Sequence, residues 1–250
     1  MEMAALVCNM IISILIPLVI WIILLIKNKE ERKGMVILFL LGALFYACMQ
    51  WVIKQEGLAY LFNHTDFKSF MDNHYIPYLL VVALAGALLA VIPEVITIML
   101  FNKKITFKQA VAMGLGYTMT ESAFLIGYPG VMTIVEVVNN KDTEFNTTAG
   151  ELFLSGYERI LLTIIGTCLI VILIYYIEQK MTVIGVTIKV ICQTLIAFMP
   201  GFFIAFSTSD YLEVFDRSFT LVMVYVVLTA AAVCSLAVLN SVKWKMYEKK

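Results

Sequence analysis

The chain has 250 residues, of which 62% are hydrophobic and only 14% are charged, and its formal net charge is zero. A mean hydropathy of +0.92 excludes an ordinary soluble domain, and the balanced charge gives no reason to expect a nucleic acid partner. The five cysteines all lie in apolar runs without CxxC spacing, which indicates small buried hydrophobes rather than a disulfide or zinc framework. The composition therefore predicts a membrane protein in contact with the lipid bilayer and indicates no cofactor.

Apolar runs of about 20 residues recur along the chain and predict an all-α polytopic bundle of about seven transmembrane helices. The first run is too long for a cleaved signal peptide and lacks a basic n-region, so we expect a retained span. We find no internal repeat, so residues 1–250 are expected to form a single membrane domain. The predicted spans are 3–26, 35–53, 75–101, 107–128, 158–178, 184–206 and 218–241.

Lysine and arginine gather in alternate connections, at 27–33, 103–108 and 243–250, whereas the connections between them are poor in both. The positive-inside rule therefore predicts an N-terminus outside and a C-terminus inside, in a multi-pass protein of the plasma membrane.

The third predicted span contains Pro93-Glu94, with Thr97 one turn further on. An ionisable side chain in a bilayer core costs at least ~2.5–3.5 kcal/mol, so it is a functional-site hypothesis by default. The alternative is a helix end close to the interface, from which Glu94 extends towards water.

The fourth predicted span reads GLGYTMTES, and its Tyr117 and Glu121 are spaced i, i+4, so both lie on one helix face. Gly114 and Gly116 belong to small-xxx-small pairs, and close helix packing explains these glycines best. Packing alone does not explain Glu121, which we expect to face a polar cavity or to be protonated.

The fifth predicted span opens with Tyr157-Glu158-Arg159, and the sixth contains Gln193. Glu158 has a structural interpretation, as an acid at a helix N-terminus, with Arg159 extending to the interface. A lone Gln193 is typical of an interhelical hydrogen bond. Both histidines, His64 and His74, lie in a polar connection, so no metal site is expected within the spans.

In their order and spacing these segments resemble the YhfC family of bacterial membrane proteins, which is grouped with CAAX-protease-like and PrsW-like intramembrane peptidases. The resemblance covers about residues 80–200, which would form a peptidase-like core. In that family one span carries E-E-x-x-R and the next carries G-x-G-H-G-x-x-E. The following span carries E-R and then a histidine, and the sixth carries a further histidine.

This sequence departs from the family pattern at most of the positions that supply chemistry. Proline and threonine replace the first acid and the arginine of E-E-x-x-R, at Pro93 and Thr97. The three histidine positions correspond to Tyr117, Gly166 and Gln193. The surviving matches are Glu94, Glu121 and Glu158-Arg159.

The leading hypothesis is a degenerate, non-catalytic member of the family that binds a membrane protein or a transmembrane peptide. The first alternative is an active glutamic-type intramembrane endopeptidase with Glu94 or Glu121 as general base in a shared water-filled cavity. The second alternative is a small transporter or channel in which both carboxylates line a proton or cation path. Candidates to line the cavity are Thr97, Tyr117, Glu158, Arg159 and Gln193.

Overall fold

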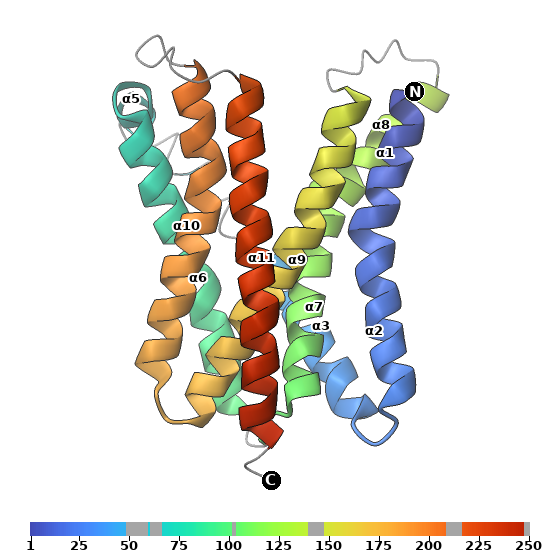
Figure 1. The fold of residues 1–250 in the computed structure, drawn as a ribbon, viewed down its shortest axis with the longest axis vertical. Coiled ribbons are helices and arrows are strands. Elements are labelled where there is room, and N and C mark those ends of the chain that lie inside the picture. The colour runs from blue at the N-terminus through green and yellow to red at the C-terminus, as the bar shows by residue number, and fades with distance from the viewer. Residues whose placement is uncertain (49–59, 61–66, 102–103, 140–147, 209–216, 248–250) are drawn as a thin grey trace.

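The computed structural model of this chain describes every residue except 49–59, 61–66, 102–103, 140–147, 209–216 and 248–250. The described part is built of helices, with no strand among its residues, which confirms the all-α prediction. The elements, shown in Figure 1, are α1 (Glu2–Met10), the π-helical turn η1 (Ile11–Leu15), α2 (Ile16–Lys27), α3 (Arg32–Cys48), α5 (Phe67–Asn73), α6 (Tyr75–Leu100), α7 (Phe107–Ser122), the π-helical turn η3 (Ala123–Gly127), α8 (Tyr128–Val138), α9 (Ala149–Glu178), α10 (Thr182–Thr208) and α11 (Arg217–Tyr247).

Six helical segments of the described chain are long and apolar enough to cross a membrane. Two of them are composite, because α1, η1 and α2 run on as Glu2–Lys27, and α7, η3 and α8 run on as Phe107–Val138. The second predicted span, 35–53, corresponds to α3, which has 17 described residues and ends at Cys48. Its predicted end lies outside the described residues. The protein is therefore a multi-pass membrane protein.

The largest boundary difference is at α9, which begins at Ala149 although the sequence predicts a span from residue 158. A capping box explains the earlier start, because the Thr148 and Glu151 side chains satisfy each other's backbone N–H groups. Glu158 therefore lies more than two turns inside α9 and not at its N-terminus.

The basic connections gather at one end of the bundle, the end at which the C-terminus lies in Figure 1. Ile105 N donates to Glu178 Oε1 at 2.7 Å, which joins the α6–α7 connection to the end of α9. Lys108 Nζ lies 3.7 Å from Glu31 Oε1, which joins α7 to the α2–α3 connection. The N-terminus lies at the opposite end (Figure 1). Which end faces the cytoplasm stays a prediction.

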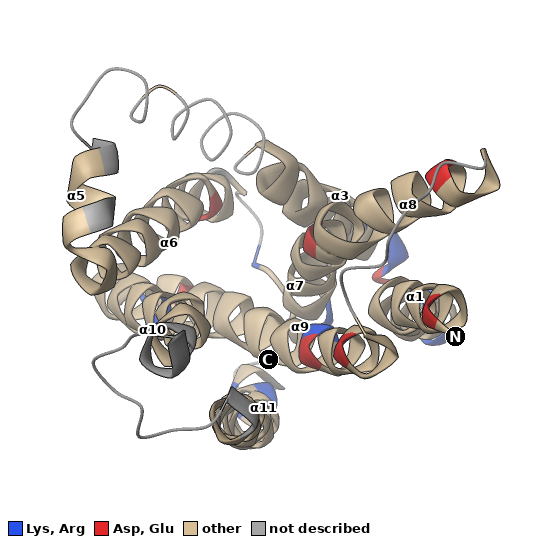
Figure 2. Cartoon of the chain, turned by 90° about the horizontal axis from the view of Figure 1, so that it is seen from above, with Lys and Arg blue, Asp and Glu red and all other residues tan. Residues whose placement is uncertain are grey.

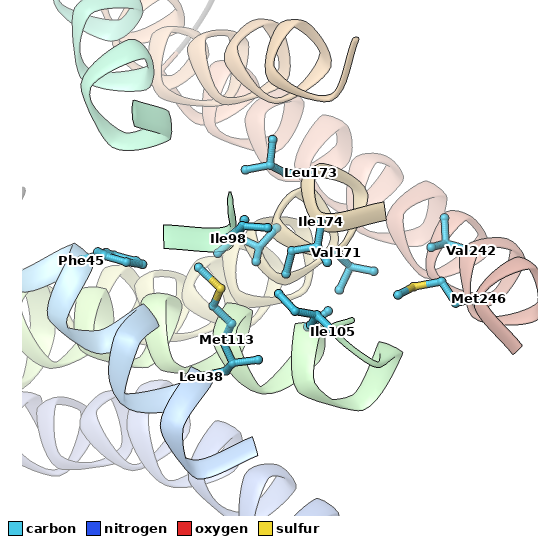
Figure 3. Packing of buried hydrophobic residues seen from close by; sticks show 12 residues of the cluster. Leu38, Phe45, Ile98, Ile105, Met113, Val171, Leu173, Ile174, Val242 and Met246 are labelled. Carbon is cyan, nitrogen blue, oxygen red and sulfur yellow. The ribbon is translucent and has the colours of Figure 1, made fainter. Parts of the chain in front are cut away.

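Helix α9 forms the centre of the bundle. In its most apolar window 56% of the residues are buried, against 17–28% in the other five candidate spans. Viewed from above, α7, α10, α11 and α1 surround it (Figure 2). The main hydrophobic cluster packs α9 against α3, α6, α7 and α11, through Leu38, Phe45, Ile98, Ile105, Met113, Val171, Leu173, Ile174, Val242 and Met246 (Figure 3).

Glycines let α7 approach both of its neighbours, as the small-xxx-small pattern predicted. A Cβ atom added at Gly116 would lie 2.0 Å from the Phe39 carbonyl oxygen on α3. One added at Gly114 would lie 2.7 Å from Thr167 Cα on α9. Because backbone atoms are the obstacle in both places, no rotamer change can make room.

We expect Gly116→Ala to destabilise the protein by about 1–3 kcal/mol, since the added methyl group must push α3 and α7 apart. Unfolding by sodium dodecyl sulfate titration in mixed micelles measures the effect. The matched control is Gly86→Ala in α6, where an added Cβ would meet nothing within 4 Å. Equal stability of the two variants would contradict the close packing.

Candidate functional site

Glu94 is fully buried and forms an ion pair with a lysine on another helix. Its carboxylate lies on α6, one residue after Pro93, and pairs through Oε2 with Lys189 Nζ of α10. The two side chains are 0% and 3% exposed. Glu94 therefore does not extend to the interface from a helix end, which was one of its two sequence interpretations.

Tyr117 and Gln193 complete the surroundings of this pair. Lys189 Nζ lies 5.7 Å from the centre of the Tyr117 ring, a cation–π distance. Gln193 lies one turn after Lys189 on α10 and close to the Tyr117 hydroxyl, and its buried Oε1 atom has no hydrogen-bond partner among the described residues. The interhelical hydrogen bond expected of a lone glutamine stays a prediction. We call Glu94, Lys189, Tyr117 and Gln193 the inner cluster.

A second group of charged side chains joins α7 to α9. Arg159 Nη1 lies 3.6 Å from Glu121 Oε1, and Arg159 Nη2 lies 3.5 Å from Glu158 Oε1. Arg159 is 14% exposed, so it points towards Glu121 instead of extending to the interface. The macrodipole does not explain Glu158, because that effect fades within the first turn and α9 starts at Ala149. We call Glu121, Glu158 and Arg159 the outer cluster.

Tyr117 connects the inner cluster with the outer cluster, because Glu121 lies one turn after it on α7. Its ring also packs edge-on against Tyr46 of α3, with centroids 5.2 Å apart. The predicted site residues Glu94, Tyr117, Glu121, Glu158, Arg159 and Gln193 are thus linked in one polar layer that crosses the bundle.

Two further positions of the family pattern carry no such interaction. Thr97 is half-buried one turn after Glu94, and its carbonyl accepts a hydrogen bond from Phe101 N at 2.9 Å. Gly166 faces α7 so closely that an added Cβ would lie 2.7 Å from Thr118 Cγ2. A side chain at residue 166 would therefore require Thr118 to shift.

Sequence reasoning missed Lys189, which the structure makes the partner of Glu94. The signal was present: a single lysine stands in the apolar run VTIKVICQ, spaced i, i+4 from Gln193. An ionisable residue within a span is expected to have a partner of opposite charge. Glu94 was a predicted acid at a similar depth in the membrane, and no cation was predicted to pair with it.

Metal binding finds no support in the described part of the chain, where no three His, Cys, Asp or Glu side chains come close enough to hold an ion. What this layer can do chemically follows from its pairs. Each carboxylate already faces a cation, Lys189 for Glu94 and Arg159 for Glu121 and Glu158.

Comparison with known proteins gives no relative: no family model, curated protein or solved structure matches this chain. The functional argument therefore depends on the geometry of the polar layer.

We expect Lys189→Met to lower the free energy of unfolding by about 3–5 kcal/mol, because the buried Glu94 carboxylate loses its partner and has to take up a proton to remain buried. The double variant Glu94→Met/Lys189→Met should recover most of this loss, since an apolar pair of similar volume needs no compensation. Detergent unfolding of the four proteins in a double-mutant cycle measures both effects. Additive losses would show that the two side chains do not interact.

Proposed function

We propose that this multi-pass membrane protein is a YhfC-like chain that has lost peptidase chemistry and binds a partner membrane protein or transmembrane segment. The observation that carries the proposal is the burial of Glu94 in an ion pair with Lys189. In this proposal the polar layer holds the helices together and contacts the partner.

A general base must reach the water that it activates, directly or through one other water. Glu94 is 0% exposed and its Oε2 atom is bound to an ammonium group. Glu121 is more accessible, at 28% exposed, but its Oε1 atom faces the Arg159 guanidinium at 3.6 Å. Neither carboxylate has the geometry of a free base.

The positions that supply histidines in the resembling family serve packing here. Tyr117 lies at cation–π distance from Lys189, and Gly166 packs against Thr118. Side chains of this kind hold helices in register without binding a metal or activating water. Their joint change from ligand to packing residue supports a loss of catalysis.

The outer cluster supports the binding part of the proposal. It combines two carboxylates with one guanidinium, and the Glu158 side chain stays 26% exposed on a membrane-spanning helix. A charged group in contact with lipid is costly. A partner segment that donates hydrogen bonds, or carries a cation, would relieve that cost on docking beside α9.

Catalysis is tested with the purified protein in proteoliposomes that also contain a fluorogenic transmembrane peptide. We expect the cleavage rate to equal that of the Glu94→Gln/Glu121→Gln variant and of empty liposomes. Cleavage that this variant abolishes would contradict the proposal and establish a glutamic endopeptidase.

Binding is tested with a photo-crosslinking amino acid at Leu154, one turn before Glu158 on the exposed side of α9. In native membranes we expect a protein adduct that Glu158→Gln reduces several-fold. A crosslinker at Val233, exposed on α11, is the control and should label lipid. Identical adducts at both positions would contradict a docking surface beside α9.

A further inference from the structure

A cavity of about 310 Å³ lies at the basic end of the bundle, where the α2–α3 connection meets the start of α7. Its wall includes three lysines, Lys27, Lys29 and Lys108, two carboxylates, Glu30 and Glu31, and the apolar Ile26. It lies at the end of the bundle, outside the polar layer of the spans, and has no part in the function proposed above.

The cavity has an excess of unpaired positive charge. Glu31 is already engaged, by Lys108 at 3.7 Å and by the Thr106 hydroxyl. Within the described residues, Lys27 and Lys29 have no carboxylate at ion-pair distance. Glu30 also lines the cavity, and no ion pair holds it among the described residues. The unpaired groups of the lining are therefore two lysines and one carboxylate, an excess of one positive charge.

An apolar stripe leads along α2 into this cavity. Val19, Ile22 and Ile26 are spaced i, i+3, i+7, so they share a helix face, and they are 52%, 41% and 60% exposed. Ile26 both ends the stripe and lines the cavity. An apolar helix face that ends at a basic cavity is complementary to a glycerophospholipid, whose acyl chains adjoin a phosphate headgroup.

We infer that this cavity binds the phosphate of an anionic phospholipid, with its acyl chains along Val19 to Ile26. Lys27 and Lys29 donate to the phosphate oxygens, while Lys108 remains with Glu31. Basic pockets beside membrane helices bind anionic headgroups in this manner. The lipid is preferred to free phosphate because the apolar stripe has no role for an inorganic ion.

The test is a titration of the full-length protein, in a neutral detergent, with dioctanoyl phosphatidylglycerol, dioctanoyl phosphatidylcholine and inorganic phosphate, followed by native mass spectrometry. We expect tighter binding of phosphatidylglycerol than of phosphatidylcholine. A lysine near an anionic lipid contributes about fivefold in affinity, so Lys27→Gln/Lys29→Gln should weaken phosphatidylglycerol binding by about 30-fold. Lys27→Arg/Lys29→Arg, which keeps both charges, should bind phosphatidylglycerol as tightly as the native protein.

The matched control is Lys243→Gln/Lys245→Gln, which removes two exposed charges near the C-terminal end of α11 and outside the cavity. It should change phosphatidylglycerol affinity less than threefold. Equal losses in the two glutamine variants would overturn the site, since they would show attraction by net charge alone. Equal affinity for the two lipids would also overturn it. Displacement of phosphatidylglycerol by an equal concentration of phosphate would assign the cavity to a free anion and contradict a lipid site.

Discussion

The buried ion pair between Glu94 and Lys189 is the interaction on which the rest of this bundle depends. Either charge alone in a bilayer core would be costly, so the two residues can be tolerated only together. They belong to α6 and α10, and α6 packs mainly against α10. The pair therefore fixes the register of these two helices, and Tyr117 extends the constraint to α7 through its ring.

The same constraint decides the functional interpretation. Acids within membrane helices are typical of active sites and ion paths, and the polar layer of this bundle contains three of them, Glu94, Glu121 and Glu158. Their surroundings differ from those of a working base. Lys189 is paired with Glu94, Arg159 faces both Glu121 and Glu158, and Gly166 packs against Thr118. In this bundle these polar side chains connect helices.

Much of the architecture could be predicted from the sequence, because long apolar runs and glycine pairs carry strong signals. The helical membrane fold and the close approach of α7 at Gly114 and Gly116 were both predictable. The start of α9 was not predicted, since its first turns are too polar for a hydropathy pattern, although Thr148 and Glu151 form a recognisable capping box.

The partners of the charged residues were the harder part. A span that is apolar on every side shows no periodicity that tells which face meets which neighbour. Lys189 was therefore overlooked, and Arg159 was assigned to the interface although it turns towards Glu121. Both errors concern contacts between helices distant in the sequence, which composition and spacing do not encode.

The most direct measurement is the labelling of Glu94 by a hydrophobic carbodiimide in intact membranes, quantified by peptide mass spectrometry. Hydrophobic carbodiimides in the bilayer react with protonated carboxyl groups, and they do not react with carboxylates that are paired with an ammonium ion. The account predicts little labelling of Glu94 in the native protein and strong labelling in Lys189→Met, where the unpaired carboxyl group takes up a proton. Strong and equal labelling in both proteins would contradict the ion pair, and with it the claim that Glu94 is held in a structural role.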